Sequence, residues 1–175
     1  MLYILSQFFV IVSDVFFIFS MLSKKKKNII FYLVFSTILF ALQYICLGGW
    51  TGAGIAGIEL VFLFVMYYLE IKDKTKYNVY VSLITIVATI AISILTWDGA
   101  ISLIPMFAMI AYLIAMMFKN VIIVKSGTFV RLILNGIYML LLSSYFGVAL
   151  TFVIIAFTIW GIVRDNQAKK QVETK

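Results

Sequence analysis

The chain has 175 residues, of which 65% are hydrophobic and 12% are charged, and its net charge is +7. A soluble domain is about 45–50% apolar and about 25% charged, so this composition excludes a soluble protein and predicts one integral membrane domain over 1–175. One cysteine and no histidine exclude an internal disulfide, a zinc site and a histidine proton relay.

Seven apolar stretches each approach the ~20 residues that a helix needs to cross a bilayer. The stretch 2–22 lacks the basic start and cleavage site of a signal peptide, so we expect it to remain as the first helix. Residues 165–175 are expected to form a cytoplasmic tail, disordered over 167–175. A six-span alternative leaves 77–95 or 126–143 as an incomplete crossing. The sequence thus predicts an all-α membrane protein with helices at roughly 2–22, 29–47, 51–69, 77–95, 100–118, 126–143 and 145–163.

The basic residues determine the expected orientation. All 14 Lys and Arg fall on one side of the seven-span arrangement, while the opposite connections carry only Asp98. The positive-inside rule then places the N-terminus outside and the C-terminus in the cytoplasm. The charge therefore requires no nucleic acid and brings contact with anionic membrane lipids. A specific lipid or partner site is the alternative for the topogenic cluster Lys24, Lys25, Lys26 and Lys27.

Small residues gather in the stretch 47–68. Three of its glycines spell G-x-G-x-x-G, but no strand and acidic residue surround them, so we reject a dinucleotide site. Small residues four apart instead favour close helix packing in lipid, within the chain or in a homodimer. We expect this packing role for Gly48, Gly52, Ala56, Gly57 and, near the C-terminus, Gly147.

The two halves of the chain show a weak internal repeat. Lys24 and Lys119 are 95 residues apart, as are Gly52 and Gly147. The order of elements suggests two parallel three-helix repeats, 2–71 and 100–164, joined by a linker helix at 77–95 (a 3+1+3 plan). Transporters with parallel repeats bind their substrate at mid-membrane between the repeats.

Two resemblances agree with this plan. The 3+1+3 order resembles the SWEET and PQ-loop superfamily, which includes sugar transporters, although no Pro-Gln pair and no matching sugar-pocket residues occur. The sequence itself resembles the YgjV family of bacterial inner-membrane proteins, which implies a multi-pass protein of the bacterial inner membrane. The residues that carry this second resemblance are Lys24–Asn28, Leu39–Leu42, Leu47–Ala53, Ile101–Pro105, Lys119 and Asn120, Tyr145–Val148 and Gly161–Arg164.

Two carboxyl groups are expected near mid-membrane. Asp14 and Glu59 each lie about 8 residues, or roughly 12 Å, from a span end. Ionisable groups are costly there, so each is a candidate for binding a proton, a cation or the substrate. The alternative for both is a protonated carboxyl group that is hydrogen-bonded to a neighbouring helix.

Polar residues in the second half complete the candidate site. Asn135 and Tyr138 share a helix face and suit a polar solute, with interhelical hydrogen bonding as the alternative. Arg131, one turn away, is expected to extend to the cytoplasmic surface or to bind an anionic ligand. Pro105 removes a backbone hydrogen bond and predicts a hinge or a static kink.

These features favour a small-solute transporter that rocks one repeat against the other and is proton-coupled through Glu59. A non-transporting receptor or partner subunit on the same scaffold is the alternative. The sequence holds no nucleophile–base pair, metal-ligand cluster or phosphate loop, so we expect neither enzymatic activity nor a cofactor.

Overall fold

The computed structural model describes residues 2–97 and 99–173, and the side chains only as far as 167. Long apolar runs form helices, because in lipid a helix satisfies every backbone polar group internally. In the described part of the chain these are α1 (Leu2–Leu22), α2 (Lys26–Leu47), α3 (Trp50–Ile71), α4 (Asn78–Leu95), α5 (Leu103–Met116), α6 (Val121–Leu141) and α7 (Tyr145–Glu173).

The all-helical prediction is confirmed. Among the described residues, six segments are long and apolar enough to cross a membrane, and the remaining apolar segment, Ala100–Met116, is shorter. The weak crossing is therefore neither 77–95 nor 126–143, as the six-span alternative expected. It is the fifth, because a 3-10 turn at Ala100–Ser102 precedes an α5 of only 14 residues.

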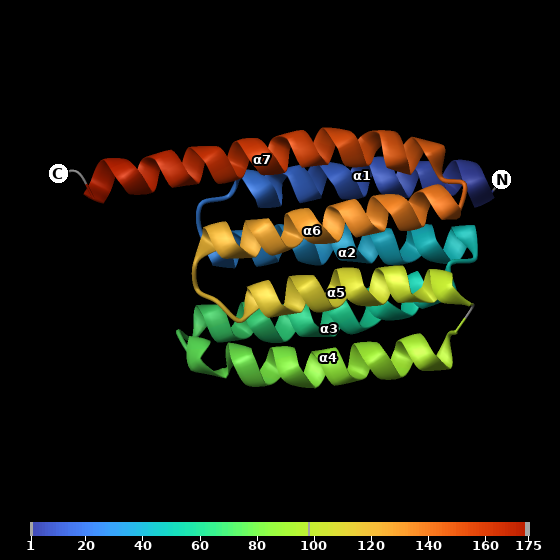
Figure 1. Cartoon of the computed structure of the whole chain (residues 1–175), viewed down its shortest axis with the longest axis horizontal. Coiled ribbons are helices and arrows are strands. Elements are labelled where there is room, and N and C mark those ends of the chain that lie inside the picture. Colours follow the sequence, from blue (N-terminus) through green and yellow to red (C-terminus); the bar gives the residue numbers. More distant parts are fainter. Residues whose placement is uncertain (1, 98, 174–175) are drawn as a thin grey trace.

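The helices lie side by side along the long axis of the molecule (Figure 1). Each of the pairs α1–α2, α2–α3, α5–α6 and α6–α7 is in contact, and α1–α7 and α3–α5 contacts join the two groups. Six helices thus form a closed ring, and α4 lies outside it against α3 and α5. The inward face of α4 is lined by Ser and Thr, and the hydroxyl groups of Thr85, Thr89 and Ser93 donate to carbonyl oxygens of α4 itself.

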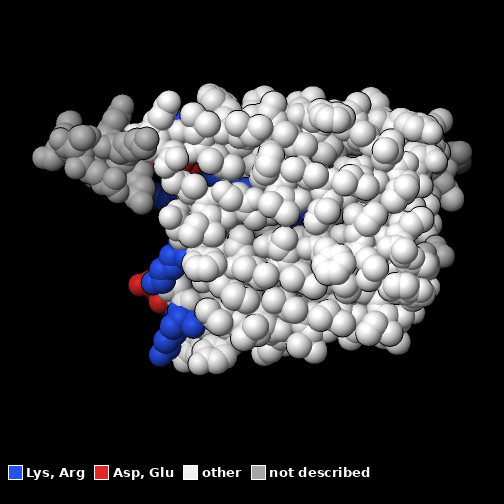
Figure 2. All heavy atoms as spheres, viewed as in Figure 1, with Lys and Arg blue, Asp and Glu red and all other residues white. Residues whose placement is uncertain are grey.

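The outer surface of the bundle is apolar. Ile4, Ile84 and Leu95 are 75%, 71% and 80% exposed, which only a lipid environment tolerates on this scale. Most of the Lys and Arg side chains visible in Figure 2 lie at one end, where the α1–α2, α3–α4 and α5–α6 connections lie (Figure 1). We call this the basic end. Asp98, expected at the other end, lies outside the described residues.

The C-terminal tail differs from expectation. Residues 167–173 continue α7 to Glu173, so the prediction of a disordered tail from 167 is wrong for this stretch. No glycine or proline follows Gly161, and Gln, Ala, Lys and Glu are good helix formers, so nothing in the sequence ends the helix at the membrane surface.

Candidate functional site: a central cavity with a buried ion pair

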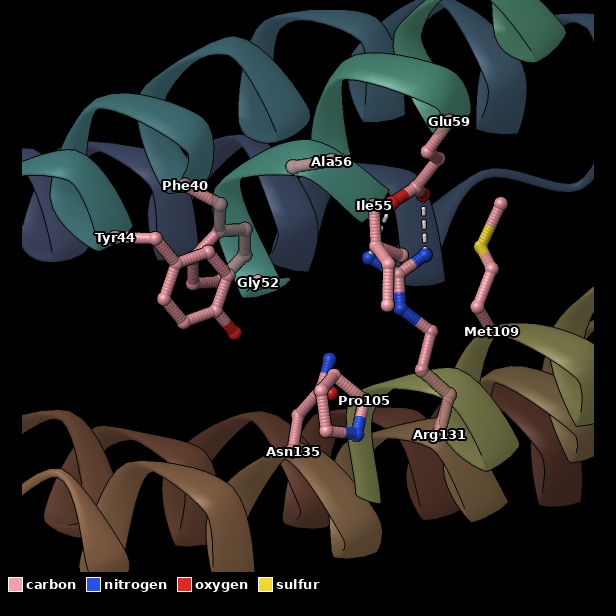
Figure 3. Close-up of a pocket in the computed structure, with 10 residues that line it drawn as sticks. All are labelled: Phe40, Tyr44, Gly52, Ile55, Ala56, Glu59, Pro105, Met109, Arg131 and Asn135. Atoms are coloured by element: carbon pink, nitrogen blue, oxygen red, sulfur yellow. Dashed lines mark hydrogen bonds and ion pairs between the residues drawn. The ribbon is translucent and has the colours of Figure 1, made fainter. Parts of the chain in front are cut away.

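A small cavity lies between α2, α3, α5 and α6 (Figure 3). It is about 20 Å³, space for roughly one water molecule. Its polar lining comes from both three-helix groups: Glu59 projects from α3, and Arg131 and Asn135 project from α6. The full lining is Phe40, Tyr44, Gly52, Ile55, Ala56, Glu59, Pro105, Met109, Arg131 and Asn135.

Glu59 and Arg131 form a two-pronged ion pair inside the cavity (Figure 3). Nη1 of Arg131 donates to Oε1 of Glu59, and Nη2 donates to Oε2 at 2.8 Å. The guanidinium group also lies 4.9 Å from the ring centre of Tyr112, within cation–π range. Both charged residues are buried, with 2% and 7% exposure, so each charge is neutralised by its partner and not by water.

This pairing corrects the expectation for Arg131. The sequence suggests a side chain that extends to the cytoplasmic surface, but the side chain points into the bundle and meets Glu59. Both carboxylate oxygens of Glu59 accept a hydrogen bond from Arg131, so Glu59 is not the protonated hydrogen-bond donor of the alternative interpretation. A role in binding a proton, a cation or the substrate stays a prediction. A carboxylate opposite a guanidinium is the arrangement that makes both charges tolerable in a low-dielectric interior.

The other predicted polar residues take different positions. The amide of Asn135 lines the cavity, as Figure 3 shows. Tyr138 is buried one turn further along α6, with its ring centre 5.8 Å from that of Tyr44. Gly52 makes room for both rings, because a Cβ atom there would lie 3.1 Å from each.

The remaining small residues divide into two groups. Ala56 is buried at the cavity, and a Cβ atom on Gly147 would lie 2.9 Å from Ser144 Oγ. Gly48 ends α2 in the left-handed region (φ 74°), and a Cβ atom added to it or to the exposed Gly57 would meet no described neighbour within 4 Å. Neither therefore packs closely within the described chain, and a role in a homodimer stays a prediction.

Pro105 lines the cavity from the first turn of α5. The backbone N–H groups of a first helical turn have no intrahelical partner, so proline costs the helix no hydrogen bond there. The expected loss of a hydrogen bond inside the helix is thus wrong, because α5 begins at Leu103, later than the predicted span. A hinge at Pro105 stays a prediction.

Asp14 is not part of this cavity. It lies on α1, which packs on α2 and α7, and it is buried with 4% exposure. Neither carboxylate oxygen has a hydrogen-bond partner among the described residues. The structure therefore separates the two carboxyl groups that look alike in the sequence: Glu59 is paired, and Asp14 is not.

Lys26 forms a polar cluster at the basic end that the sequence did not predict. Its Nζ donates to the carbonyl oxygens of Met116 and Phe118, at 3.0 Å each, and lies 3.2 Å from Oε1 of Glu70. Lys26 is thus buried, unlike the exposed Lys24, Lys25 and Lys27. We call these contacts the Lys26 cluster; they join α2 and α3 to the end of α5.

A second cluster of the same design lies around Lys125. Its Nζ donates to Oδ2 of Asp165 at 2.6 Å, and Arg164 binds Oδ1 of the same carboxylate. Nη2 of Arg164 also donates to the carbonyl oxygen of Leu22 at 2.9 Å. This Lys125 cluster joins α6 and α7 to the end of α1. One signal in the sequence could have revealed the two clusters: their carboxylates, Glu70 and Asp165, are 95 residues apart, which is the offset of the internal repeat.

The end of the bundle opposite the basic end contains a second cavity. This larger cavity, about 330 Å³, lies between the ends of α3, α4, α5 and α6. Tyr138 lines this cavity and also contacts the Gly52 position of the central cavity. The packed rings of Tyr44 and Tyr138 therefore separate the two spaces.

The comparisons with known proteins identify the family. The family model Imp-YgjV, described as a bacterial inner membrane protein, matches residues 4–169. The chain belongs to this family. No curated protein and no solved structure matches it. Membership in the Imp-YgjV family confirms the predicted YgjV resemblance and, with six candidate spans, a multi-pass protein of the bacterial inner membrane.

Proposed function

We propose that this protein is a transporter for a small polar solute, which binds at the central cavity between α1–α3 and α5–α7. The observation that carries the proposal is the convergence of polar side chains from both groups on one cavity, Glu59 from the first and Arg131 and Asn135 from the second. A structural subunit would have no need for polar groups around a void at this place. The proposed activity is not enzymatic.

The packing of the helices supports two moving halves. In two parallel repeats, α1 corresponds to α5 and α3 corresponds to α7. The contact between α1 and α7 then has its equivalent in the contact between α5 and α3, and both contacts exist. The outer position of α4 suits a linker between two parallel repeats. This is the SWEET-like plan that the order of elements suggests, and it provides two bodies that can rock about a central site.

The clusters at the basic end support a closed state on that side. Each cluster holds one hydrogen-bond link between the two groups: Lys26 of α2 donates to the carbonyl oxygen of Met116 in α5, and Arg164 of α7 donates to that of Leu22 in α1. The ion pairs Lys26–Glu70 and Lys125–Asp165 lie within their own groups and hold these side chains in place. The two links between the groups can break when water enters, whereas the opposite end already contains a cavity of about 330 Å³. With the basic end on the cytoplasmic side, this conformation would be closed to the cytoplasm.

A thermal-shift screen tests the binding site. We expect at least one small metabolite to raise the Tm of the purified protein, by about 5–10 °C at 100 times its Kd. Asn135→Ala should reduce this shift, because Asn135 supplies the amide group that lines the cavity. Asn28→Ala is the matched control, since Asn28 is exposed at the basic end. A shift that both variants retain would place the site elsewhere.

The two basic-end clusters predict a change in access. Lys26→Met together with Arg164→Met should speed labelling of the variant Met109→Cys, whose position lines the cavity, by an impermeant maleimide from the basic end, because these two side chains make the bonds between the groups. Bonds to charged groups contribute about 1.5–3 kcal/mol, so their loss should raise the open population about tenfold or more.

The labelling uses a Cys46→Ser background, because Cys46 is the only native cysteine. Lys24→Met is the control, since Lys24 is exposed. Equal labelling rates in the double variant and the control would show that the two clusters do not hold the basic end closed.

The size of the cavity supports a second candidate, a non-transporting receptor or partner subunit. A space of about 20 Å³ admits no solute without movement, and the Glu59–Arg131 pair already satisfies its own charges. If no metabolite shifts the Tm and the labelling rate never changes, this second function is the better one.

A further inference from the structure

Asp14 is a buried ionisable group that the central cavity does not use. It lies on the face of α1 that also carries Val10, Phe17 and Met21, all of which are at most 1% exposed. Both of its oxygens are buried and lack a hydrogen-bond partner among the described residues. An ionised carboxylate in such a place costs several kcal/mol, whereas a protonated carboxyl group does not carry this penalty.

Within the described part of the chain, no basic side chain is positioned to neutralise Asp14. Of the helices packed on α1, α2 carries Tyr32, Tyr44 and, at the basic end, Lys26 and Lys27. Lys26 is engaged by Glu70, and Lys27 is exposed and lies over the ring of Tyr67. The other, α7, contributes Arg164 and Asp165, also at the basic end, where they pair with each other. A proton can neutralise Asp14 without breaking the Lys26–Glu70 and Arg164–Asp165 ion pairs.

A row of unsatisfied polar groups leads from Asp14 toward the end opposite the basic end. Hydrogen bonds from Ser13 to Ser36 and from Ser20 to Ile29 fix the register of α1 and α2. In this register Gln7 of α1 lies level with Gln43 of α2. Gln7 Oε1 and both amide atoms of Gln43 are buried without partners in the described structure.

Ser144 extends the same row. The Oγ atom of Ser144 is also buried without a described partner. A Cβ atom on Gly147 would lie 2.9 Å from Ser144 Oγ and 3.5 Å from Gln43 Nε2, so these two polar atoms lie close together beside Gly147. Buried polar groups of this kind are usually bridged by ordered water, which can conduct protons between them.

We propose that Asp14 is a proton-binding site that is loaded from the end opposite the basic end, past Gln43 and Ser144. In the loading step a proton passes from water to one carboxylate oxygen of Asp14 and forms the neutral acid; on release it returns to water. A metal cation would need several oxygen ligands, and no cluster of three His, Cys, Asp or Glu exists among the described residues.

The geometry also connects this site to the central cavity. Tyr44 follows Gln43 in α2 and lines the central cavity. We therefore assign the coupling proton to Asp14 in place of Glu59. This coupling rests on the proposed transport function, while proton binding at Asp14 does not.

Infrared spectroscopy of the full-length protein in lipid vesicles tests proton binding directly. At pH 7 the wild type should show the C=O stretch of a protonated carboxyl group, and Asp14→Asn should lose that band. Asparagine keeps the size and neutrality of the protonated acid, so this variant should fold. Asp165→Asn is the matched control and should keep the band, because Asp165 is ionised by Lys125 and Arg164.

A spectrum without this band, or a band that survives in Asp14→Asn, overturns the proposal. Gln43→Leu tests the route: after a change to heavy water, the shift of the Asp14 band should be slower than in the wild type, and an equal rate overturns loading past Gln43. If the band behaves as expected but no solute binds or crosses, proton binding stands and the proposed transport fails. If a solute crosses with the same pH profile in Asp14→Asn, transport stands and the coupling fails.

Discussion

Glu59→Gln should destabilise the protein by about 3–5 kcal/mol, the usual cost of removing one partner of a buried ion pair. The substitution keeps the shape of the side chain but leaves the Arg131 guanidinium charged, 7% exposed and without its two charged acceptors. The face of Tyr112 offsets only part of this loss, since a cation–π contact contributes about 0.5–2 kcal/mol. Reversible unfolding by SDS in mixed micelles measures the change.

A double-mutant cycle separates the pair from the effect of either side chain alone. Arg131→Gln should cost a similar amount, and the double variant should be more stable than the sum of the two costs predicts, because it leaves no uncompensated charge. Asp14→Asn serves as the control, since Asp14 has no described partner that the substitution would leave as an uncompensated charge. If Glu59→Gln unfolds like the wild type, Arg131 is not held as a cation by Glu59.

The ion pair also determines what a solute must do. A ligand that enters the cavity meets Glu59 and Arg131 already joined, so it must either bind beside the pair, at Asn135 and Tyr44, or separate the two charges. A neutral polar solute can do the first. Separation requires a ligand that supplies replacement charges to both residues, because an unpaired charge at this depth costs several kcal/mol.

The sequence predicted the helices well where apolar runs had clear ends. The helix α1 occupies the predicted 2–22, and α3 ends at Ile71 before the lysines of the next connection. The boundary between the predicted fifth and sixth spans was less accurate, because Ser102 and Lys125 interrupt the apolar runs without marking the true helix ends. There α6 begins at Val121, where Asn120 accepts a hydrogen bond from the N–H of Ile122.

The partners of the polar residues could not be predicted. Every helix face is apolar, so the pattern does not reveal the rotation of α3 and α6, and that rotation brings Glu59 to Arg131 across 72 positions of sequence. For the same reason the sequence placed Lys26 among the solvated charges, although it bonds to the end of α5. The residue type itself was informative: the sequence singled out Glu59 and Asp14 as carboxyl groups inside apolar runs, and both are buried in the structure.

Gly127→Ala should destabilise the protein by about 1–3 kcal/mol, the usual cost of overpacking. Gly127 lies on α6 where it crosses α5, and a Cβ atom there would overlap Cβ of Ala115 and lie 3.3 Å from the carbonyl oxygen of Ala111. Neither neighbour is the end of a flexible side chain, so the two helices must move apart. The same SDS titration measures the loss.

Gly57→Ala is the matched control, because it introduces the same methyl group inside α3 where no described atom lies within 4 Å of the Cβ position. It should leave stability unchanged or raise it by about 0.5–1 kcal/mol, since alanine favours a helix over glycine. A loss at Gly57 as large as that at Gly127 would instead mean that the exposed face of α3 is covered by a second copy of the chain. The predicted homodimer would then involve this face, and the loss should depend on protein concentration, whereas a clash between α5 and α6 within one chain should not.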